Sequence, residues 1–262
     1  MTARIEQIAR RLDRAWEDRK AISPLSDTEG LDSPTVAYQI QTRWSELRVE
    51  RGEQVLGHKI GLTSQAMRDQ IGVDEPDYGR LWESRFFPAH GGRAIVPSNV
   101  FLQPRAEGEL AFLIGKPLDR TDCTADDVLI ATDAVAVAVE VIDSRITDWQ
   151  IKLVDTIADN ASFGAFTLGL WDPALSDADL RTIGMLVQHN GVTAVEAVGS
   201  AALGHPARSV AWLASTLNRL GVGLLPGDIV LSGALGRSLP AVRGDEFIIE
   251  AHGQPPLTVV FD

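Results

Sequence analysis

The sequence predicts an α+β fold, with a small helical region at the N-terminus and a curled, mostly β core after it. Apolar residues recur at helical spacing in about the first fifty residues, whereas later apolar runs are mostly short, alternating or β-branched, as in strands. A chain of 262 residues with 45% hydrophobic and 23% charged content suits one large domain with a small cap. We therefore expect an N-terminal helical cap region at residues 1–52 and a β domain at residues 53–262.

Two amphipathic helices account for the N-terminal region. Between Thr2 and Lys20, one helical face carries a set of apolar residues, Ile5, Ile8, Leu12, Ala15 and Trp16. Ser33 then offers an N-cap and Pro34 a first-turn proline for a second helix. The stripe of this second helix consists of Val36, Ile40, Trp44 and Leu47. We expect both stripes to face the core.

Charge and cysteine content exclude several classes of partner. The net charge of −12 argues against nucleic acid and anionic membranes, because both bind basic patches. Small anionic substrates stay compatible, since a bound metal reverses the sign locally. The single cysteine, Cys123, permits no intrachain disulfide, and no histidine lies near it in sequence, so we interpret it as a bystander in a reducing compartment. Without a signal peptide or a run of ~20 apolar residues, we expect a cytoplasmic protein with no membrane association.

The first predicted strand of the β domain, residues 55–62, carries a lysine between two glycines on the same face. Gly57, Lys59 and Gly61 share one face, so the ammonium of Lys59 has space around it, as in a lysine that reaches into a pocket. The alternative is an exposed or structural lysine. His58 lies on the apolar face and is expected to be a core histidine rather than a ligand.

Two glutamates two residues apart stand at the entry to the run 103–114, which is expected to form a strand. Side chains alternate along a strand, so Glu107 and Glu109 point the same way and repel each other. A cation between them relieves this repulsion, and hard oxygen ligands favour Mg²⁺ or Mn²⁺. Gly108 faces the opposite side and permits close approach of another segment. The alternative is a solvated strand edge.

Three further polar residues extend the candidate site. Glu140 ends the small, β-branched run 134–142, and a glutamate buried there must be paired, protonated or bound to metal. Asp77 lies in a loop punctuated by proline and glycine, where it either pairs with Lys59 or initiates a turn. Ser162, in the polar turn 159–164, either contacts a ligand or holds the turn.

The remaining elements complete a β-rich chain. Thr63 can cap a short helix that ends near Gly72, and a helix begins at about Thr124. Asn190-Gly191 predicts a hairpin between two strands, and Pro206 starts another helix. Further strands are expected near residues 93–96, 163–168, 229–231, 247–250 and 257–261. The sequence has no phosphate loop, dinucleotide fingerprint, zinc spacing or Gly-x-Ser-x-Gly motif.

The ordered set of motifs resembles the hydratase and decarboxylase branch of the fumarylacetoacetate hydrolase superfamily over almost the whole chain. The segments that carry the resemblance are 57–64, 76–79, 103–112, 140–145, 155–162 and 226–228. The resemblance implies a mixed β-roll or sandwich core with a small N-terminal helical region. It also implies a metal triad of Glu107, Glu109 and Glu140 that binds Mg²⁺ or Mn²⁺, catalytic roles for Lys59 and Asp77, a substrate contact at Ser162, and a homo-oligomer.

By the same resemblance, the expected reaction is metal-dependent hydration of 2-hydroxypenta-2,4-dienoate, in equilibrium with 2-oxopent-4-enoate, to 4-hydroxy-2-oxopentanoate in meta-cleavage degradation of aromatic compounds. Lys59 and Asp77 would transfer protons and orient water. The expected partners are this small 2-oxo acid, further copies of the chain, and a related decarboxylase or a downstream aldolase.

Three alternatives stay open at this stage. One is decarboxylation of 4-oxalocrotonate (2-oxo-3-hexenedioate) within the same branch. Another is hydration of 2-oxohept-4-ene-1,7-dioate, which requires a cation for the distal carboxylate, and the sequence leaves open whether Arg145 or Lys152 reaches it. The third is a non-catalytic partner subunit of a hydratase–decarboxylase complex, although such a subunit has no need for buried charge.

Overall fold

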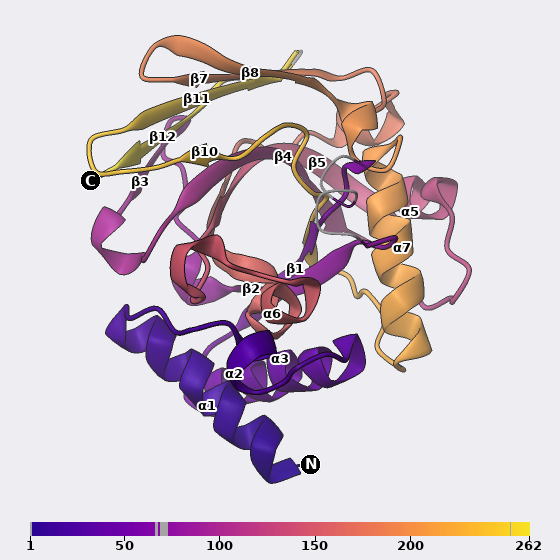
Figure 1. Ribbon diagram of the computed structural model, residues 1–262. Helices are drawn as coiled ribbons and strands as arrows, with labels where there is room; N and C mark the ends of the chain where they lie inside the picture. The colour runs from indigo at the N-terminus through magenta and orange to yellow at the C-terminus, as the bar shows by residue number, and fades with distance from the viewer. Residues whose placement is uncertain (1, 66–67, 69–72, 252) are drawn as a thin grey trace.

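Two β-sheets and two groups of helices build the computed structural model, which describes residues 2–65, 68, 73–251 and 253–262. The seven-stranded sheet has the order β2-β1-β9-β4-β5-β6, with β10 paired to β4, and the five-stranded sheet has the order β3-β12-β11-β7-β8. The first sheet curls, and the second lies across its upper side in Figure 1. The predicted α+β class with a mixed, curled β core is confirmed.

Most of the described helices and strands match the ranges that the sequence predicts. The loop predicted at residues 74–79 is wrong in its second half, because a strand begins at Asp77, and the elements at 25–28, 153–158 and 239–240 are not predicted. The helices are α1 (Thr2–Asp18), α2 (Leu25–Thr28), α3 (Pro34–Val49), α5 (Ala125–Ala131), α6 (Leu153–Ala158) and α7 (Pro206–Arg219). The strands are β1 (Val55–Gly61), β2 (Asp77–Trp82), β3 (Arg93–Val96), β4 (Arg105–Ile114), β5 (Thr132–Ile142), β6 (Phe163–Leu168), β7 (Gly184–His189), β8 (Val192–Val198), β9 (Ile229–Leu231), β10 (Leu239–Pro240), β11 (Glu246–Ala251) and β12 (Leu257–Phe261). The short helix predicted between Thr63 and Gly72 falls largely outside the described residues.

The N-terminal helices pack on the seven-stranded sheet through a cluster of aromatic rings. Trp16 of α1, Trp44 of α3 and Trp82 of β2 meet edge to face, with ring centroids 5.0–6.0 Å apart. The same core includes Phe163 and Phe166 of β6. Figure 1 shows these helices below the sheet. The predicted boundary at residues 52 and 53 falls between α3 and β1, and the division into two domains stays a prediction.

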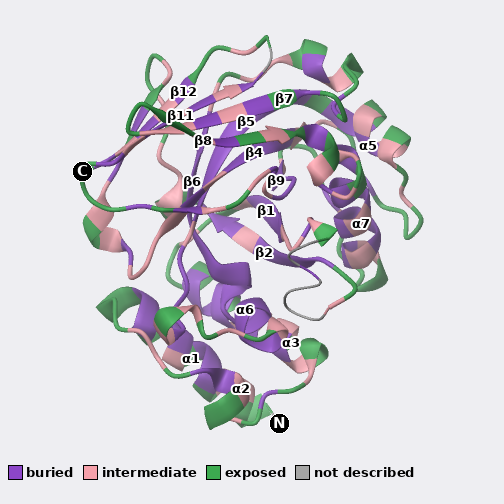
Figure 2. Ribbon diagram, turned by 45° about the horizontal axis from the view of Figure 1, so that its top comes forward, coloured by how far each residue is buried: buried purple, intermediate pink, exposed green. Residues whose placement is uncertain are grey.

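A second core fills the space between the two sheets and extends under α5 and α7. It contains Phe112 of β4, Phe247 of β11 and Phe261 of β12, all fully buried. Gly108 allows the sheets to approach, because a Cβ there would lie 2.7 Å from Met185 Sδ. Glu107 and Glu109 project from the opposite face of β4, in the part of the fold that Figure 2 shows as largely buried.

Candidate metal centre and active site

Three glutamates from two neighbouring strands form a single cluster. β4 and β5 pair antiparallel, with Glu107 directly opposite Glu140. One carboxylate oxygen from each of Glu107, Glu109 and Glu140 lies within 4.8 Å of the other two. Glu109 and Glu140 are fully buried, and Glu107 is partly exposed. The arrangement thus brings together the three acids singled out in the sequence.

Burial and mutual repulsion make this cluster unfavourable without a cation. Burial, followed by the charge of Glu140, raises the pKa of Glu107 to about 7. Burial and then both neighbouring glutamates raise the pKa of Glu109 well above its ordinary value. Burial also raises the pKa of Glu140, although Lys59 opposes this shift. The cluster is therefore expected to bind positive charge.

Lys59 projects from β1 into the same buried region. Its Nζ lies 3.2 Å from Glu140 Oε1 and donates a hydrogen bond to the carbonyl of Ala161 at 2.9 Å. Burial alone would lower the pKa of Lys59, but Glu140, Asp77 and the other glutamates raise it above its ordinary value. The alternative of an exposed lysine is wrong, since only 3% of Lys59 is exposed.

The two glycines beside Lys59 have different functions. A Cβ on Gly61 would lie 2.2 Å from Asp77 Oδ1 and 3.5 Å from Lys59 Nζ, so this glycine makes room for both groups. A Cβ on Gly57 would instead collide with the backbone of Ile229, so Gly57 permits the parallel pairing of β1 with β9. Of the two glycines, Gly61 is the one that gives the lysine its space.

Asp77, Thr156 and Ser162 form a chain of polar groups beside Lys59. Asp77 is buried at the first position of β2, so the alternative of a turn-initiating aspartate is wrong. The hydroxyl of Thr156 donates to Asp77 Oδ2 at 3.3 Å and lies 3.4 Å from the Ser162 hydroxyl. Burial raises the pKa of Asp77, while Lys59 and Thr156 oppose the shift.

The segment that contains Ser162 has a strained backbone. Asn160, Ala161 and Ser162 have φ values of 55°, 50° and 53°, and none is a glycine. Each left-handed residue of this kind costs about 1–2 kcal/mol, least for asparagine. Surrounding contacts must therefore stabilise this turn, and it presents the Ala161 carbonyl to Lys59.

Neither cation considered for a distal substrate carboxylate is free to bind one. The guanidinium of Arg145 is fully buried and donates to Asp159 and to the carbonyl of Phe163. Lys152 is exposed and pairs with Asp27 at 2.8 Å. Neither of these two side chains therefore offers the cation that the longer dicarboxylate requires.

Three parts of the site escaped the sequence analysis. Thr156 lies in α6 without a motif around it, and the backbone N–H of Gly233, which donates to Glu109 Oε2 at 2.8 Å, comes from a segment far along the chain. The ion pair between Arg145 and Asp159 is also not predicted from the sequence. The sequence indicates this ion pair only through the position of Arg145, which closely follows a buried apolar run.

Two residues considered in the sequence lie outside the site. His58 is buried in the core, and burial lowers its pKa to about 3, which agrees with a core histidine. Cys123 is half-buried, and burial raises the pKa of its thiol, which agrees with a bystander. Its backbone N–H donates to Ser215 Oγ at 3.1 Å.

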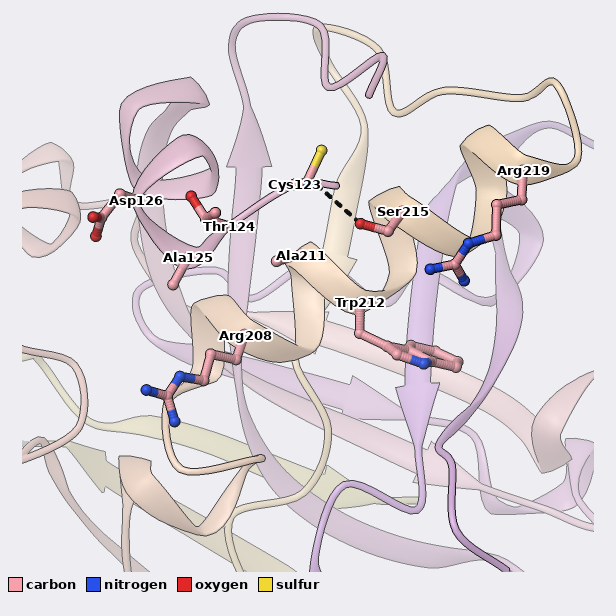
Figure 3. Close-up of a pocket in the computed structure, with 9 residues that line it drawn as sticks. All are labelled: Cys123, Thr124, Ala125, Asp126, Arg208, Ala211, Trp212, Ser215 and Arg219. Atoms are coloured by element: carbon pink, nitrogen blue, oxygen red, sulfur yellow. Dashed lines mark hydrogen bonds between the residues drawn. The ribbon is translucent and has the colours of Figure 1, made fainter. Parts of the chain in front are cut away.

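A hollow of about 540 Å³ between α5 and α7 contains none of the candidate site residues. Figure 3 shows it, with Arg208 and Arg219 extending from α7 on either side of Trp212. Its lining residues are Cys123, Thr124, Ala125, Asp126, Arg208, Ala211, Trp212, Ser215 and Arg219. The chemistry of the carboxylate cluster, rather than the size of this hollow, identifies the candidate active site.

The cluster fits a divalent, oxygen-ligated cation. Among the described residues, no donor hydrogen-bonds to Glu109 Oε1 or to Glu140 Oε2, whereas Glu140 Oε1 pairs with the ammonium of Lys59 at 3.2 Å. Buried acceptors without donors are rare in proteins and point to an absent partner. Three carboxylates without nitrogen or sulfur ligands fit Mg²⁺ or Mn²⁺, as the sequence predicts, and do not by themselves select one ion.

Comparison with known proteins agrees with this geometry. Residues 70–261 match the model of the fumarylacetoacetate (FAA) hydrolase C-terminal family. The chain is 39% identical over 257 residues to a 2-keto-4-pentenoate hydratase of Paraburkholderia xenovorans, covering 98% of this chain and 94% of the relative. It is 45% identical over 221 residues to a 2-hydroxypent-2,4-dienoate hydratase of Pseudomonas putida, covering 83% and 97%.

Solved structures resemble the whole chain, and one of them was determined with magnesium bound. It is a 4-oxalocrotonate decarboxylase from Pseudomonas putida G7, complexed with magnesium and adipate. The two chains superpose with a TM-score of 0.95 at 30% sequence identity, covering 100% of this chain and 98% of the decarboxylase.

Proposed function

This chain belongs to the fumarylacetoacetate hydrolase family, and we propose that it is a metal-dependent hydratase of 2-hydroxypenta-2,4-dienoate, with 4-hydroxy-2-oxopentanoate as product. The observation that carries the proposal is the convergence of Glu107, Glu109 and Glu140 beside the buried amine of Lys59. The names of its relatives support the choice of hydration within the family.

In this proposal Glu107, Glu109 and Glu140 would hold Mg²⁺ or Mn²⁺ through their carboxylate oxygens. When bound, the cation would supply Lewis-acid charge at the carboxylate and 2-oxygen end of the substrate. The buried glutamates fix the orientation of the substrate and keep bulk water away from it.

Proton transfer is assigned to the residues beside the cluster. Lys59, kept as an ammonium by the surrounding carboxylates, delivers a proton to C5 of the dienol and leaves 2-oxopent-3-enoate. In that step the 2-hydroxyl of the dienol gives up its proton to Asp77. Water, oriented by Asp77 with Thr156 and Ser162 behind it, then forms the C4–O bond; its released proton restores Lys59, and Asp77 passes the former 2-hydroxyl proton to C3. The product gains one molecule of water and nothing else.

Decarboxylation of 4-oxalocrotonate is the second candidate, since a decarboxylase has nearly the same fold over the whole chain. A decarboxylase would use the same cluster with the 2-oxo group as the electron sink. Arg145, which is engaged within the protein, and Lys152, which pairs with Asp27 at the surface, do not supply the cation that the second carboxylate of 4-oxalocrotonate would require.

A paired assay tests the proposal. Purified protein is stripped with a chelator, reloaded with Mg²⁺ or Mn²⁺, and given 2-hydroxypenta-2,4-dienoate or 4-oxalocrotonate. We expect metal-dependent loss of dienoate absorbance without CO₂. Release of CO₂ from oxalocrotonate as the main reaction would instead assign the protein as a decarboxylase, and inactivity with both substrates would favour a non-catalytic partner subunit.

The proposal includes an assembly and a location. We propose a homo-oligomer that can associate with a related decarboxylase or a downstream aldolase, and a cytoplasmic location in the meta-cleavage pathway. Light scattering of the purified protein, alone and with each partner enzyme, measures the assembly. In the part of the chain that the structure describes, no helix is both long and apolar enough to cross a bilayer.

A further inference from the structure

The turn from Asp159 to Phe163 contacts the catalytic amine, the neighbouring strand β2 and the segment that follows β5. Its Ala161 carbonyl accepts the hydrogen bond of Lys59 Nζ. Its Asn160 side chain brackets the backbone of Arg80 on β2, accepting from the N–H at 2.8 Å and donating to the carbonyl at 2.9 Å. Its Ser162 carbonyl accepts from the N–H of Asp143 after β5, at 2.7 Å.

A glycine opposite the lysine admits this turn. Gly79 pairs with Lys59 in the β1–β2 ladder. A Cβ on Gly79 would lie 2.4 Å from the carbonyl oxygen of Asn160. The turn therefore packs directly against the backbone of β2 at Gly79, which has no side chain. From this position its Ala161 carbonyl contacts Lys59 on the neighbouring strand β1.

A single buried arginine secures both ends of the turn. Arg145 Nε donates to Asp159 Oδ1 at 2.5 Å, and its backbone N–H donates to Asp159 Oδ2 at 2.9 Å. Its two terminal nitrogens donate to the carbonyl of Asp159 at 2.5 Å and to the carbonyl of Phe163 at 2.7 Å. The guanidinium also packs over the rings of Trp16 and Trp44 of the N-terminal helices. Its planar fork suits a clamp that spans two carbonyls and a carboxylate.

We propose that Arg145 is a positioning residue of the reaction: it holds the left-handed turn 160–162 in the conformation in which the Ala161 carbonyl aims Lys59 at the substrate. Arg145 touches neither Lys59 nor the glutamates through any contact described above, so it acts through the turn. The inference rests on the proposed function, because the orientation of Lys59 affects the rate only if Lys59 transfers the proton in that reaction. It also gives the N-terminal helices a function, because they pack against the outer side of the clamp.

The substitution Ala161→Gly tests the effect of the turn on the reaction rate separately from its effect on stability. Ala161→Gly keeps the carbonyl and relieves the positive φ, so the fold has no reason to be lost, but the turn becomes free to adopt other conformations. We expect kcat to fall about 10- to 100-fold, with unchanged KM and unchanged affinity for Mn²⁺. Asp148→Gly is the matched control, because Asp148 is an exposed non-glycine residue with a φ of 54°. Arg145→Lys, which keeps the charge but cannot span both ends, should resemble Ala161→Gly.

A double-mutant cycle with Lys59→Met tests whether the turn acts through the lysine. We expect Ala161→Gly to lower kcat in the native background and to change nothing further in the Lys59→Met background. An unchanged kcat in Ala161→Gly, or a full additional loss in the Lys59→Met background, would overturn the inference. A crystal structure of Arg145→Lys in which Lys59 keeps its 2.9 Å contact with the Ala161 carbonyl would overturn it as well, independently of activity. Inactivity of the unmodified enzyme would instead count against the proposed function.

Discussion

Replacing Glu109 by glutamine should change stability in opposite directions with and without metal. In the metal-free protein, Glu109 is one of three buried carboxylates within 4.8 Å of one another. At an effective dielectric constant of 20, two unit charges at that distance repel by about 3 kcal/mol. The raised pKa values of the cluster mean that protonation already relieves part of this repulsion. We therefore expect the substitution to raise the free energy of unfolding of the metal-free protein by about 1–2 kcal/mol.

With metal bound, the order should reverse. A cation present at a hundred times its dissociation constant stabilises the native state by about 2.7 kcal/mol. Glutamine still accepts from the N–H of Gly233, but it supplies a weaker, neutral ligand to the cation, so the variant should lose most of this gain. The crossover isolates metal binding from a general effect of the substitution on packing.

Thermal unfolding measured in chelator and in excess Mn²⁺ checks this prediction. Each kcal/mol corresponds to about 2–4 °C in Tm for a chain of this size. Glu196→Gln, at an exposed position on β8, is the matched control and should shift Tm in neither condition. The reasoning would be refuted if Glu109→Gln were less stable than the native protein in both conditions. It would also be refuted if Mn²⁺ left the Tm of the native protein unchanged.

Three further predictions concern residues around the cluster. Lys59→Met should keep Mn²⁺ affinity, measured by calorimetry, and lose at least about 10²-fold in kcat; loss of metal binding as well would make the lysine structural. Gly61→Ala should lower kcat and leave Mn²⁺ affinity intact, because its Cβ would displace Asp77 from a position 2.2 Å away; native kinetics would contradict the packing described here. His58 has a folded pKa of about 3, so below its unfolded value of about 6.5 only the unfolded chain gains the proton, and stability falls as the pH decreases. Between pH 6.5 and 5 the loss should be about 2 kcal/mol by chemical denaturation, and His58→Phe should remove that share of the pH dependence.

The sequence predicts the strands well because their local signals agree with their tertiary surroundings. The period of two places Glu107 and Glu109 on one face, and the structure keeps both there. Asn190-Gly191 forms the predicted hairpin between β7 and β8, with positive φ at both residues. Glu140 is inferred from burial alone, and its partner strand brings it opposite Glu107.

The parts that escape prediction depend on contacts between distant segments. No pattern near Thr156 indicates that α6 places its hydroxyl against Asp77 of β2. The left-handed conformation of Ala161 has no local sequence signal, since alanine disfavours positive φ, and it exists because Arg145 and the neighbouring strands impose it. The pKa of Lys59 likewise depends on how many carboxylates surround it, which only the folded chain defines.

The most direct test of the account is the position of Mn²⁺ in crystals of the protein, located by anomalous diffraction. We predict one peak among Glu107, Glu109 and Glu140, at about 2.0–2.2 Å from one oxygen of each, with Lys59 Nζ beside it and outside the coordination shell. A saturated crystal with no peak between these three carboxylates, or with the ion held by other residues, would contradict it.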